Sequence, residues 1–144
     1  MQQKDIQALY IITGCSKGIG KVLTDKLLQA NNTYVVGISR TAVTAKARFK
    51  HIEADLSDWQ SLVDKLNLIL PDAFSFKTIV LINNAAWVGE LKHIGNLDTI
   101  SLPTAFTINS IAPAILMNAF VQKYESVAAE RIVIIAFSMN NYRS

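Results

Sequence analysis

The stretch Thr13-Gly14-Cys15-Ser16-Lys17-Gly18-Ile19-Gly20 decides the fold class of this 144-residue chain. Before it stands Ala8–Thr13, a short apolar segment that predicts a buried strand. After it comes Gly18–Ala30, whose apolar residues recur every three to four positions, as on one face of a helix. The stretch is therefore predicted to be a glycine-rich loop between a strand and a helix.

The three glycines of this loop suit a phosphate-binding turn. Gly14 permits a sharp turn out of the strand, while Gly18 and Gly20 omit side chains where backbone must approach a pyrophosphate and where helix packs on strand. The first turn of the helix offers free N–H groups and the positive end of its dipole to an anion. The alternative is an ordinary glycine turn, and we interpret Cys15 as a small spacer rather than a nucleophile.

Strand-length apolar segments and longer helical segments alternate along the rest of the chain. The predicted strands are Ala8–Thr13, Tyr34–Ser39, Phe49–Glu53, Thr78–Ile82 and Arg131–Phe137. The predicted helices are Gly18–Ala30, Trp59–Leu70 and Ser101–Ser126. Because such alternation calls for parallel strands and right-handed crossovers, we expect one domain over residues 1–144. Its class is α/β, a three-layer, Rossmann-like, doubly wound sheet of strand order 3-2-1-4-5, with the ligand crevice at the carboxyl end of the first strand.

Composition excludes several other classes of function. The chain is 51% hydrophobic and 17% charged, which suits a sheet covered by helices or a surface left for a partner. The single cysteine excludes an internal disulfide, and with only two histidines besides it we expect no metal site. The net charge of +3 is spread without a basic run, so we expect no nucleic-acid partner. With no signal-peptide layout and no apolar run of about 18 residues, we expect no membrane span and a cytoplasmic location.

The end of the second predicted strand indicates which nucleotide the crevice takes. An NAD-binding site would have an acidic residue here to accept hydrogen bonds from the ribose hydroxyls. Instead Arg40 stands between two hydroxyl residues, Ser39 and Thr41, a set suited to a 2′-phosphate. Lys17 in the glycine loop offers a second positive charge. These residues favour NADP(H) over NAD(H), unless Arg40 merely solvates the strand end.

The spacing Thr-Gly-x-x-x-Gly-x-Gly resembles that of the short-chain dehydrogenase/reductase family, of the sepiapterin-reductase and benzil-reductase type. The resemblance implies hydride transfer between NADP(H) and a small carbonyl or alcohol substrate. It also implies a set of cofactor-binding residues: Gly14, Ser16, Lys17, Gly18, Ile19, Gly20, Ser39, Arg40, Thr41, Asp55, Leu56, Asn84, Ala85 and Ala86.

Two further motifs carry the resemblance. Asp55 stands where the family binds the adenine amino group, with Leu56 against the ring, although Asp55 is as well suited to cap the helix near Trp59. Asn83-Asn84-Ala85-Ala86 matches the family's Asn-Asn-Ala-Gly turn, with one extra methyl at Ala86. In the family this turn supports the central strand and contacts the adenine-side ribose.

Asn109 and Pro113 stand four residues apart inside the long predicted helix. Proline has no N–H, so it cannot bond to the carbonyl of Asn109, and the helix should bend there. In the resembled family the matching asparagine sits at such a break and holds a water of the proton relay, which makes Asn109 a candidate catalytic residue. The alternative is a simple proline kink.

The family's Tyr-x-x-x-Lys pair is absent from this sequence. The residues four positions after Tyr10, Tyr34 and Tyr124 are not lysines, and the chain ends two residues after Tyr142. Ser138 is only a weak candidate for the family's catalytic serine, since it lies one residue late in the fifth predicted strand. The resemblance therefore implies that the C-terminal part of the fold is missing, by truncation or frameshift. A non-catalytic NADP(H)-binding module remains the alternative to an active reductase.

The predicted helix 101–126 is apolar nearly all round, and in the resembled family the matching helix lies at a dimer interface. A fifth strand without a neighbour would expose further apolar surface. We therefore expect a homo-oligomer formed through Ser101–Ser126.

Overall fold

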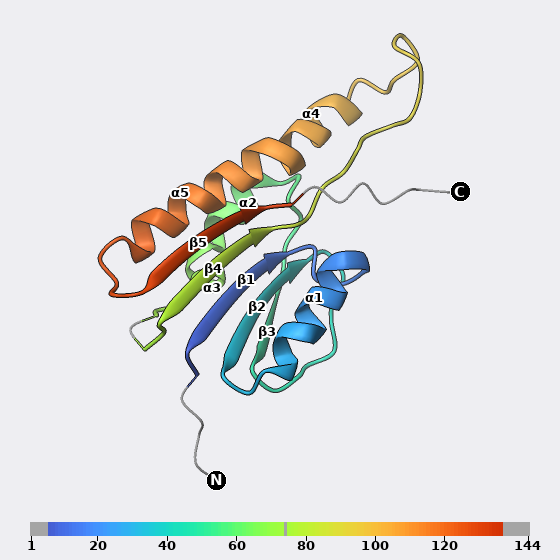
Figure 1. Cartoon of the computed structure of the whole chain (residues 1–144). Helices are drawn as coiled ribbons and strands as arrows, with labels where there is room; N and C mark the ends of the chain where they lie inside the picture. The colour runs from blue at the N-terminus through green and yellow to red at the C-terminus, as the bar shows by residue number, and fades with distance from the viewer. Residues whose placement is uncertain (1–5, 74, 137–144) are drawn as a thin grey trace.

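A five-stranded sheet forms the centre of the molecule (Figure 1). The computed structural model describes residues 6–73 and 75–136. The strands are β1 (Ala8–Thr13), β2 (Thr33–Ser39), β3 (Phe49–Glu53), β4 (Thr78–Asn83) and β5 (Glu130–Ile135). They lie in the order β3-β2-β1-β4-β5, and every neighbouring pair is parallel. The predicted α/β class and strand order are therefore confirmed.

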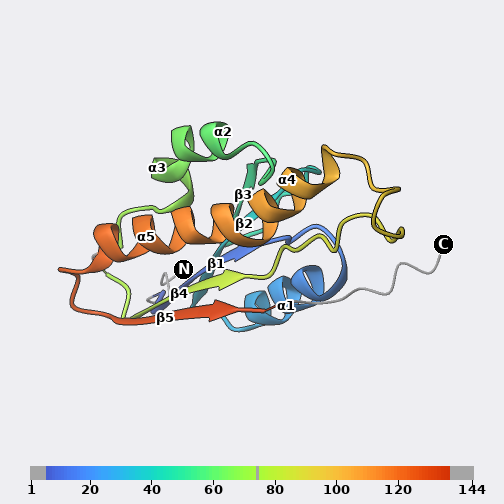
Figure 2. The ribbon, with the colours of Figure 1, turned by 90° about the horizontal axis from the view of Figure 1, so that it is seen from above.

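Helices cover both faces of the sheet and give three layers (Figure 2). Among the described residues, α1 (Gly18–Gln29) is the helix on one face. The opposite face carries α2 (Trp59–Asp64), α3 (Leu66–Ile69), α4 (Ser101–Phe106), η1 (Thr107–Ile111) and α5 (Ala112–Tyr124).

The interior strands are buried on both faces, which explains their unbroken apolar sequences. Ile11 of β1, Val36 of β2 and Leu81 of β4 belong to the core on the α5 side of the sheet. Ile12 and Val35 belong to the second core, on the α1 side. Both cores meet the backbone of the same three strands, so the carboxyl ends of β1, β2 and β4 are held in fixed positions.

The segment predicted as one helix over Trp59–Leu70 forms two short helices instead. Lys65 separates them, and its N–H bonds to the carbonyl of Leu62, which tightens the turn. The Lys65 ammonium donates to the carbonyl of Glu53 at the end of β3, 2.6 Å away. The apolar face survives the break, since Leu62 and Ile69 are both fully buried.

The predicted helix Ser101–Ser126 is a single rod that ends at Tyr124 and contains the wider π-helical segment η1. The N–H of Ala112 bonds to the carbonyl of Thr107, five residues earlier, and Pro113 follows directly. The helix thus has a π segment at Asn109, directly before Pro113, where the sequence predicts a bend.

The rod Ser101–Tyr124, with a mean hydropathy of 1.4, is long and apolar enough to cross a membrane by length and composition alone. The expectation that no apolar run is long enough to span a membrane is therefore wrong. The core helix of a globular protein passes the same test. Leu116 and Phe120 pack against the sheet.

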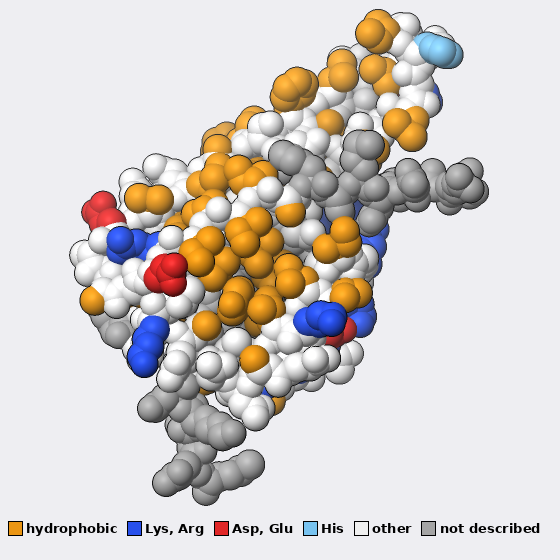
Figure 3. All heavy atoms as spheres, viewed as in Figure 1, with side chains coloured by type: hydrophobic (Ala, Val, Ile, Leu, Met, Phe, Trp, Pro, Cys, Tyr) orange, Lys and Arg blue, Asp and Glu red, His pale blue; other side chains and the backbone are white. Residues whose placement is uncertain are grey.

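Strand β5 is exposed on both faces, in contrast to its neighbour β4. Ile132 and Ile134 point to the α1 side, and Val133 and Ile135 to the α5 side, with exposed fractions from 37% to 50%. Figure 3 shows apolar side chains gathered over β4 and β5 beside α1. The predicted exposure of apolar surface around the fifth strand is thus present in the described part of the chain.

Arginines from later segments cap the carboxyl ends of two helices. Arg48, in the left-handed conformation at φ 60°, donates to the carbonyl of Leu28 in the last turn of α1 and to those of Ala30 and Thr33 just after it. Arg131 donates likewise to three carbonyls at the end of α5. Each guanidinium also faces the negative end of the helix dipole.

Candidate functional site

A cavity of about 420 Å³ opens at the carboxyl ends of β1, β2 and β4, where the strand order predicts a ligand crevice. Twelve of the fourteen predicted cofactor-binding residues line it: Gly14, Ser16, Lys17, Ile19, Ser39, Arg40, Thr41, Asp55, Leu56, Asn84, Ala85 and Ala86. Gly18 and Gly20 do not. Seven lining residues lay outside the predicted set: Ile38, Ala54, Ser57, Trp87, Val88, Thr104 and Ile108.

The glycine loop leaves the first turn of α1 open toward this cavity. Gly14 and Gly18 have φ of 73° and 58°, which glycine adopts without strain. Lys17 precedes the helix in extended conformation, no side chain caps the helix, and no acidic residue stands in its first turn. The free N–H groups of that turn are therefore available to an anion.

Gly20 lies at the closest approach between α1 and the loop. A methyl group added there would lie 2.0 Å from the Gly14 carbonyl oxygen and 2.5 Å from the Asn84 amide nitrogen. The third glycine therefore serves close packing of helix, loop and strand, as its place in the motif predicts.

Asn84 joins the ends of the two central strands. Its amide nitrogen donates to the carbonyls of Thr13 and Gly14, at 3.1 and 3.3 Å. The Thr13 hydroxyl in turn accepts from the backbone N–H groups of Asn84 and Ala85, both at 3.0 Å. The Asn-Asn-Ala-Ala turn thus fixes the floor of the cavity against the start of the glycine loop.

The turn after β2 carries Arg40 to the rim of the cavity, where its side chain is exposed. The Ser39 hydroxyl donates to the carbonyl of Thr41, 2.7 Å away, and lies 2.7 Å from Nε2 of His51. The structure therefore brings Arg40 and Thr41 together with Lys17 around one opening.

Asp55 closes a turn beneath Arg40. One of its carboxylate oxygens accepts from both the N–H and the hydroxyl of Ser57, at 2.9 and 2.7 Å. Burial acts to raise the pKa of Asp55, but the two Ser57 groups and the Arg40 guanidinium outweigh it and lower that pKa. The helix that begins at Trp59 is capped by Asp58 instead, so the capping role considered for Asp55 belongs to Asp58.

Asn109 does not line the cavity and acts on it through Trp87. Its side-chain oxygen accepts from the Trp87 N–H at 2.8 Å, and its side-chain nitrogen donates to the Trp87 carbonyl at 2.7 Å. These two bonds tie the segment after β4 to η1. They fix one end of the cavity wall that Trp87, Val88, Thr104 and Ile108 form.

Other reactive groups are few around the cavity. Cys15 is buried within the glycine loop, and this burial raises the pKa of its thiol. Among the residues that the structure describes, no group of histidine, cysteine and acidic side chains is arranged to hold a metal ion. Ser138, the weak catalytic candidate, lies outside the described residues.

Comparison with known proteins gives a consistent result. The family model for short chain dehydrogenases matches residues 8–142. The benzil reductase of Bacillus subtilis, described as (S)-benzoin forming, is 28% identical over 129 residues, which cover 88% of this chain and 53% of that protein. The chain therefore spans about half the length of this relative.

Solved structures agree in fold. A short-chain dehydrogenase/reductase from Burkholderia vietnamiensis superposes with a TM-score of 0.81 at 28% identity, over 95% of this chain and 67% of that one. A short chain dehydrogenase from Leptospira borgpetersenii, solved with bound NAD+, superposes with a TM-score of 0.72 at 16% identity, over 91% of this chain and 51% of that one. The glycine loop, the parallel sheet and the family match agree, and the chain belongs to the short-chain dehydrogenase family, whose members are oxidoreductases that bind nicotinamide cofactors.

Proposed function

We propose that the chain binds NADP(H) in this cavity, and that the protein is an NADP-dependent oxidoreductase interconverting a small carbonyl compound and its alcohol. The observation that carries the proposal is Arg40 at the cavity rim, directly after β2, where an acidic residue would select NAD(H). Arg40 is followed by Thr41, whose hydroxyl is a further donor for a phosphate.

The phosphate end of the cavity fits such a cofactor. The uncapped first turn of α1 offers N–H donors to a pyrophosphate, and Ser16 and Lys17 stand beside it. The Arg40 guanidinium would bind the 2′-phosphate through charge-assisted hydrogen bonds. Asp55 and Leu56 on the same wall would face the adenine.

At the opposite end, the cavity wall suits a nicotinamide ring and an apolar substrate. When bound, the cofactor supplies or accepts the hydride. Trp87, Val88 and Ile108 would exclude water from the reacting carbon, and Asn109 holds this wall in place through Trp87. By analogy with the benzil reductase relative, we propose an aromatic diketone as the first substrate to test.

A second candidate is a nucleotide-binding module without turnover. It is motivated by the tyrosines of this sequence, none of which is followed four residues later by a lysine, the pair that the resembled family uses for proton donation. Both candidates predict NADPH binding, and only the first predicts oxidation of NADPH with benzil. A binding titration and a 340 nm assay on one sample separate them.

The test of cofactor choice compares Arg40→Ala with Lys50→Ala, which removes an exposed positive charge of β3 outside the cavity. Loss of a charge-assisted contact should weaken NADPH binding by about tenfold to a hundredfold. NADH binding should change less than twofold in both variants. If Arg40→Ala binds NADPH as well as the unaltered chain does, the proposal is wrong.

We also propose a cytoplasmic location and a homo-oligomer. Exposed Leu102 and Phe106 on α4, and Val121 on α5, support an interface with a second copy along Ser101–Tyr124. The charge introduced by Phe106→Glu should shift the protein toward monomer in light-scattering chromatography. A monomer already present in the unaltered chain would contradict this interface.

A further inference from the structure

The turn that carries Arg40 is held by a short chain of hydrogen bonds from β3. The Ser39 hydroxyl oxygen lies 2.7 Å from the carbonyl oxygen of Thr41 and 2.7 Å from Nε2 of His51. Ser39 itself is buried, with 7% of its surface exposed, and His51 is half-buried. Both contacts are therefore partly shielded from water.

Proton counting fixes the direction of both bonds. A carbonyl oxygen only accepts, so the single hydroxyl proton of Ser39 goes to Thr41. Ser39 then has no proton left for His51 and must accept from it, which places a proton on Nε2 of the imidazole. The chain runs in one direction, from His51 through Ser39 to the Thr41 carbonyl, and Arg40 stands inside the turn that it closes.

Strand register explains why His51 reaches Ser39. His51 pairs with Gly37 in the β2–β3 ladder, and Ser39 lies two residues farther along the same face of β2. Because Gly37 has no side chain, Cys15 and Phe49 pack over it; an added methyl group would lie 2.7 Å from each. The imidazole is thus beside a closely packed layer under the glycine loop.

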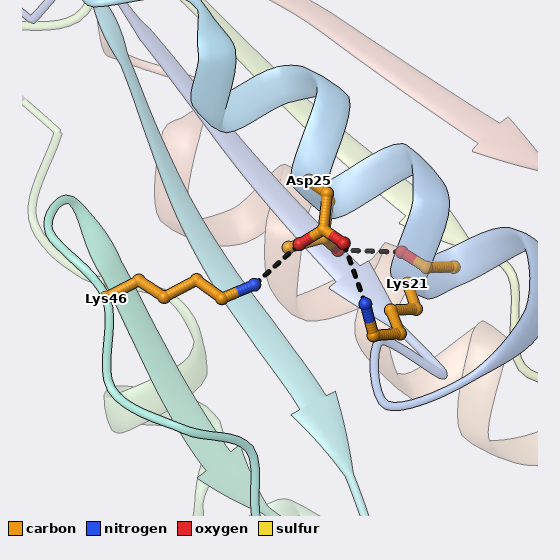
Figure 4. A network of polar contacts seen from close by, with 5 residues as sticks. Lys21, Asp25 and Lys46 are labelled. Carbon is orange, nitrogen blue, oxygen red and sulfur yellow. Dashed lines mark hydrogen bonds and ion pairs between the residues drawn. The ribbon is translucent and has the colours of Figure 1, made fainter.

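The segment from Arg40 to Arg48 is anchored at its far end as well. Lys46 reaches back to Asp25 of α1, which also pairs with Lys21 (Figure 4). Arg48 caps the end of α1. These contacts hold the part of the segment that lies far from the cavity. At the cavity end, His51 contacts the turn through Ser39, and the Asp55 carboxylate lies close enough to the Arg40 guanidinium for that charge to lower its pKa.

We propose that His51 is a positioning residue for cofactor choice: acting through Ser39, it holds the turn that presents Arg40 to the 2′-phosphate of NADP(H). This inference rests on the proposed function, in which Arg40 binds that phosphate. His51 does not line the cavity, so we expect no direct contact between it and the cofactor. Its effect is therefore expected on NADPH and not on NADH.

The test uses His51→Leu, which cannot donate, and His51→Gln, whose side-chain amide replaces the Nε2 donor. In the Leu variant the dissociation constant for NADPH should rise about three- to tenfold, while that for NADH changes less than twofold. The Gln variant should recover most of the NADPH affinity. Hydrogen exchange of the backbone from Arg40 to Thr41, measured without cofactor, should speed up in the Leu variant alone.

Each result decides a different claim. If the unaltered chain shows no preference for NADPH, the proposed function fails, and this inference fails with it. If the preference exists and His51→Leu keeps it, or weakens NADPH and NADH equally, the positioning role is wrong while the proposed function stands. Unchanged hydrogen exchange in His51→Leu overturns the inference independently of binding.

Discussion

Gly20→Ala brings two physical effects of opposite sign into one measurement. Gly20 stands in the first turn of α1 and does not have the positive φ that would itself require glycine. Helix propensity and the smaller entropy of the unfolded chain would make alanine more stable by about 0.4–1 kcal/mol. Packing predicts the reverse, since the added methyl group would lie 2.0 Å from the Gly14 carbonyl oxygen.

The structure gives the size of the packing effect. Real side-chain contacts begin near 3.0 Å, so the loop must move by about 1 Å from the position at which the two atoms would be 2.0 Å apart. That movement disrupts the bonds from Asn84 to the carbonyls of Thr13 and Gly14. Two hydrogen bonds at about 1 kcal/mol each and about 1–3 kcal/mol of overpacking exceed the propensity gain, leaving a net loss of about 2–4 kcal/mol.

Urea unfolding followed by tryptophan fluorescence measures this loss. The control is Gly95→Ala, where φ is 100° and no atom lies within 4 Å of the added methyl group, so only backbone strain of about 1–2 kcal/mol is expected. Gly20→Ala should lose more stability than this control. A Gly20→Ala chain as stable as the unaltered one, or more stable, would refute the packing argument.

Three further changes test other contacts. Arg48→Ala should cost about 2 kcal/mol in urea unfolding, and Arg48→Gly less, since glycine keeps φ at 60° without strain; equal losses would contradict the backbone part of this reasoning. Tyr124→Phe removes the hydrogen bond to the Pro71 carbonyl and should cost about 1 kcal/mol at neutral pH. Burial raises the pKa of Tyr124, so the tyrosine stabilises the folded chain fully below about pH 10 and progressively less as the pH rises further. If the stabilities of the unaltered chain and of Tyr124→Phe change in parallel above about pH 10, the raised pKa is contradicted. Asn109→Leu removes both hydrogen bonds to the Trp87 backbone, so it should red-shift the tryptophan emission and weaken NADPH binding. An unchanged emission spectrum would argue that these two bonds do not hold Trp87 in place.

Sequence periodicity predicts the strands well because interior parallel strands must be apolar along their whole length. The interior strand Ala8–Thr13 occurs with the predicted bounds, and so does Phe49–Glu53 at the edge of the sheet, where Phe49 and Ile52 are the buried residues. The break at Lys65 was not predicted, because a one-residue interruption leaves the apolar stripe of Trp59–Leu70 in phase. Periodicity reports which face is buried and does not register a single tightened turn.

The phosphate end of the site was predicted because its residues lie in short motifs with fixed spacing. The opposite wall was not, since Trp87 and Thr104 come from a long loop and a helix whose meeting depends on the side chain of Asn109. The contact of His51 with Ser39 requires the register between β2 and β3, which the separate strand patterns do not contain.

The proposed cofactor binding and the proposed turnover would depend on different parts of this sheet. The glycine loop, the Arg40 turn and the Asn84 turn all follow interior strands that are buried on both faces, and of these strands only β4 pairs with β5. Strand β5 is the exposed edge, and an edge strand is ordered by whatever pairs with it or covers it. The resemblance to the family assigns a catalytic serine to this strand, so the proton-transfer step should be sensitive to the covering of β5. NADPH binding should then persist in conditions, such as mild denaturant or dilution, that abolish any turnover.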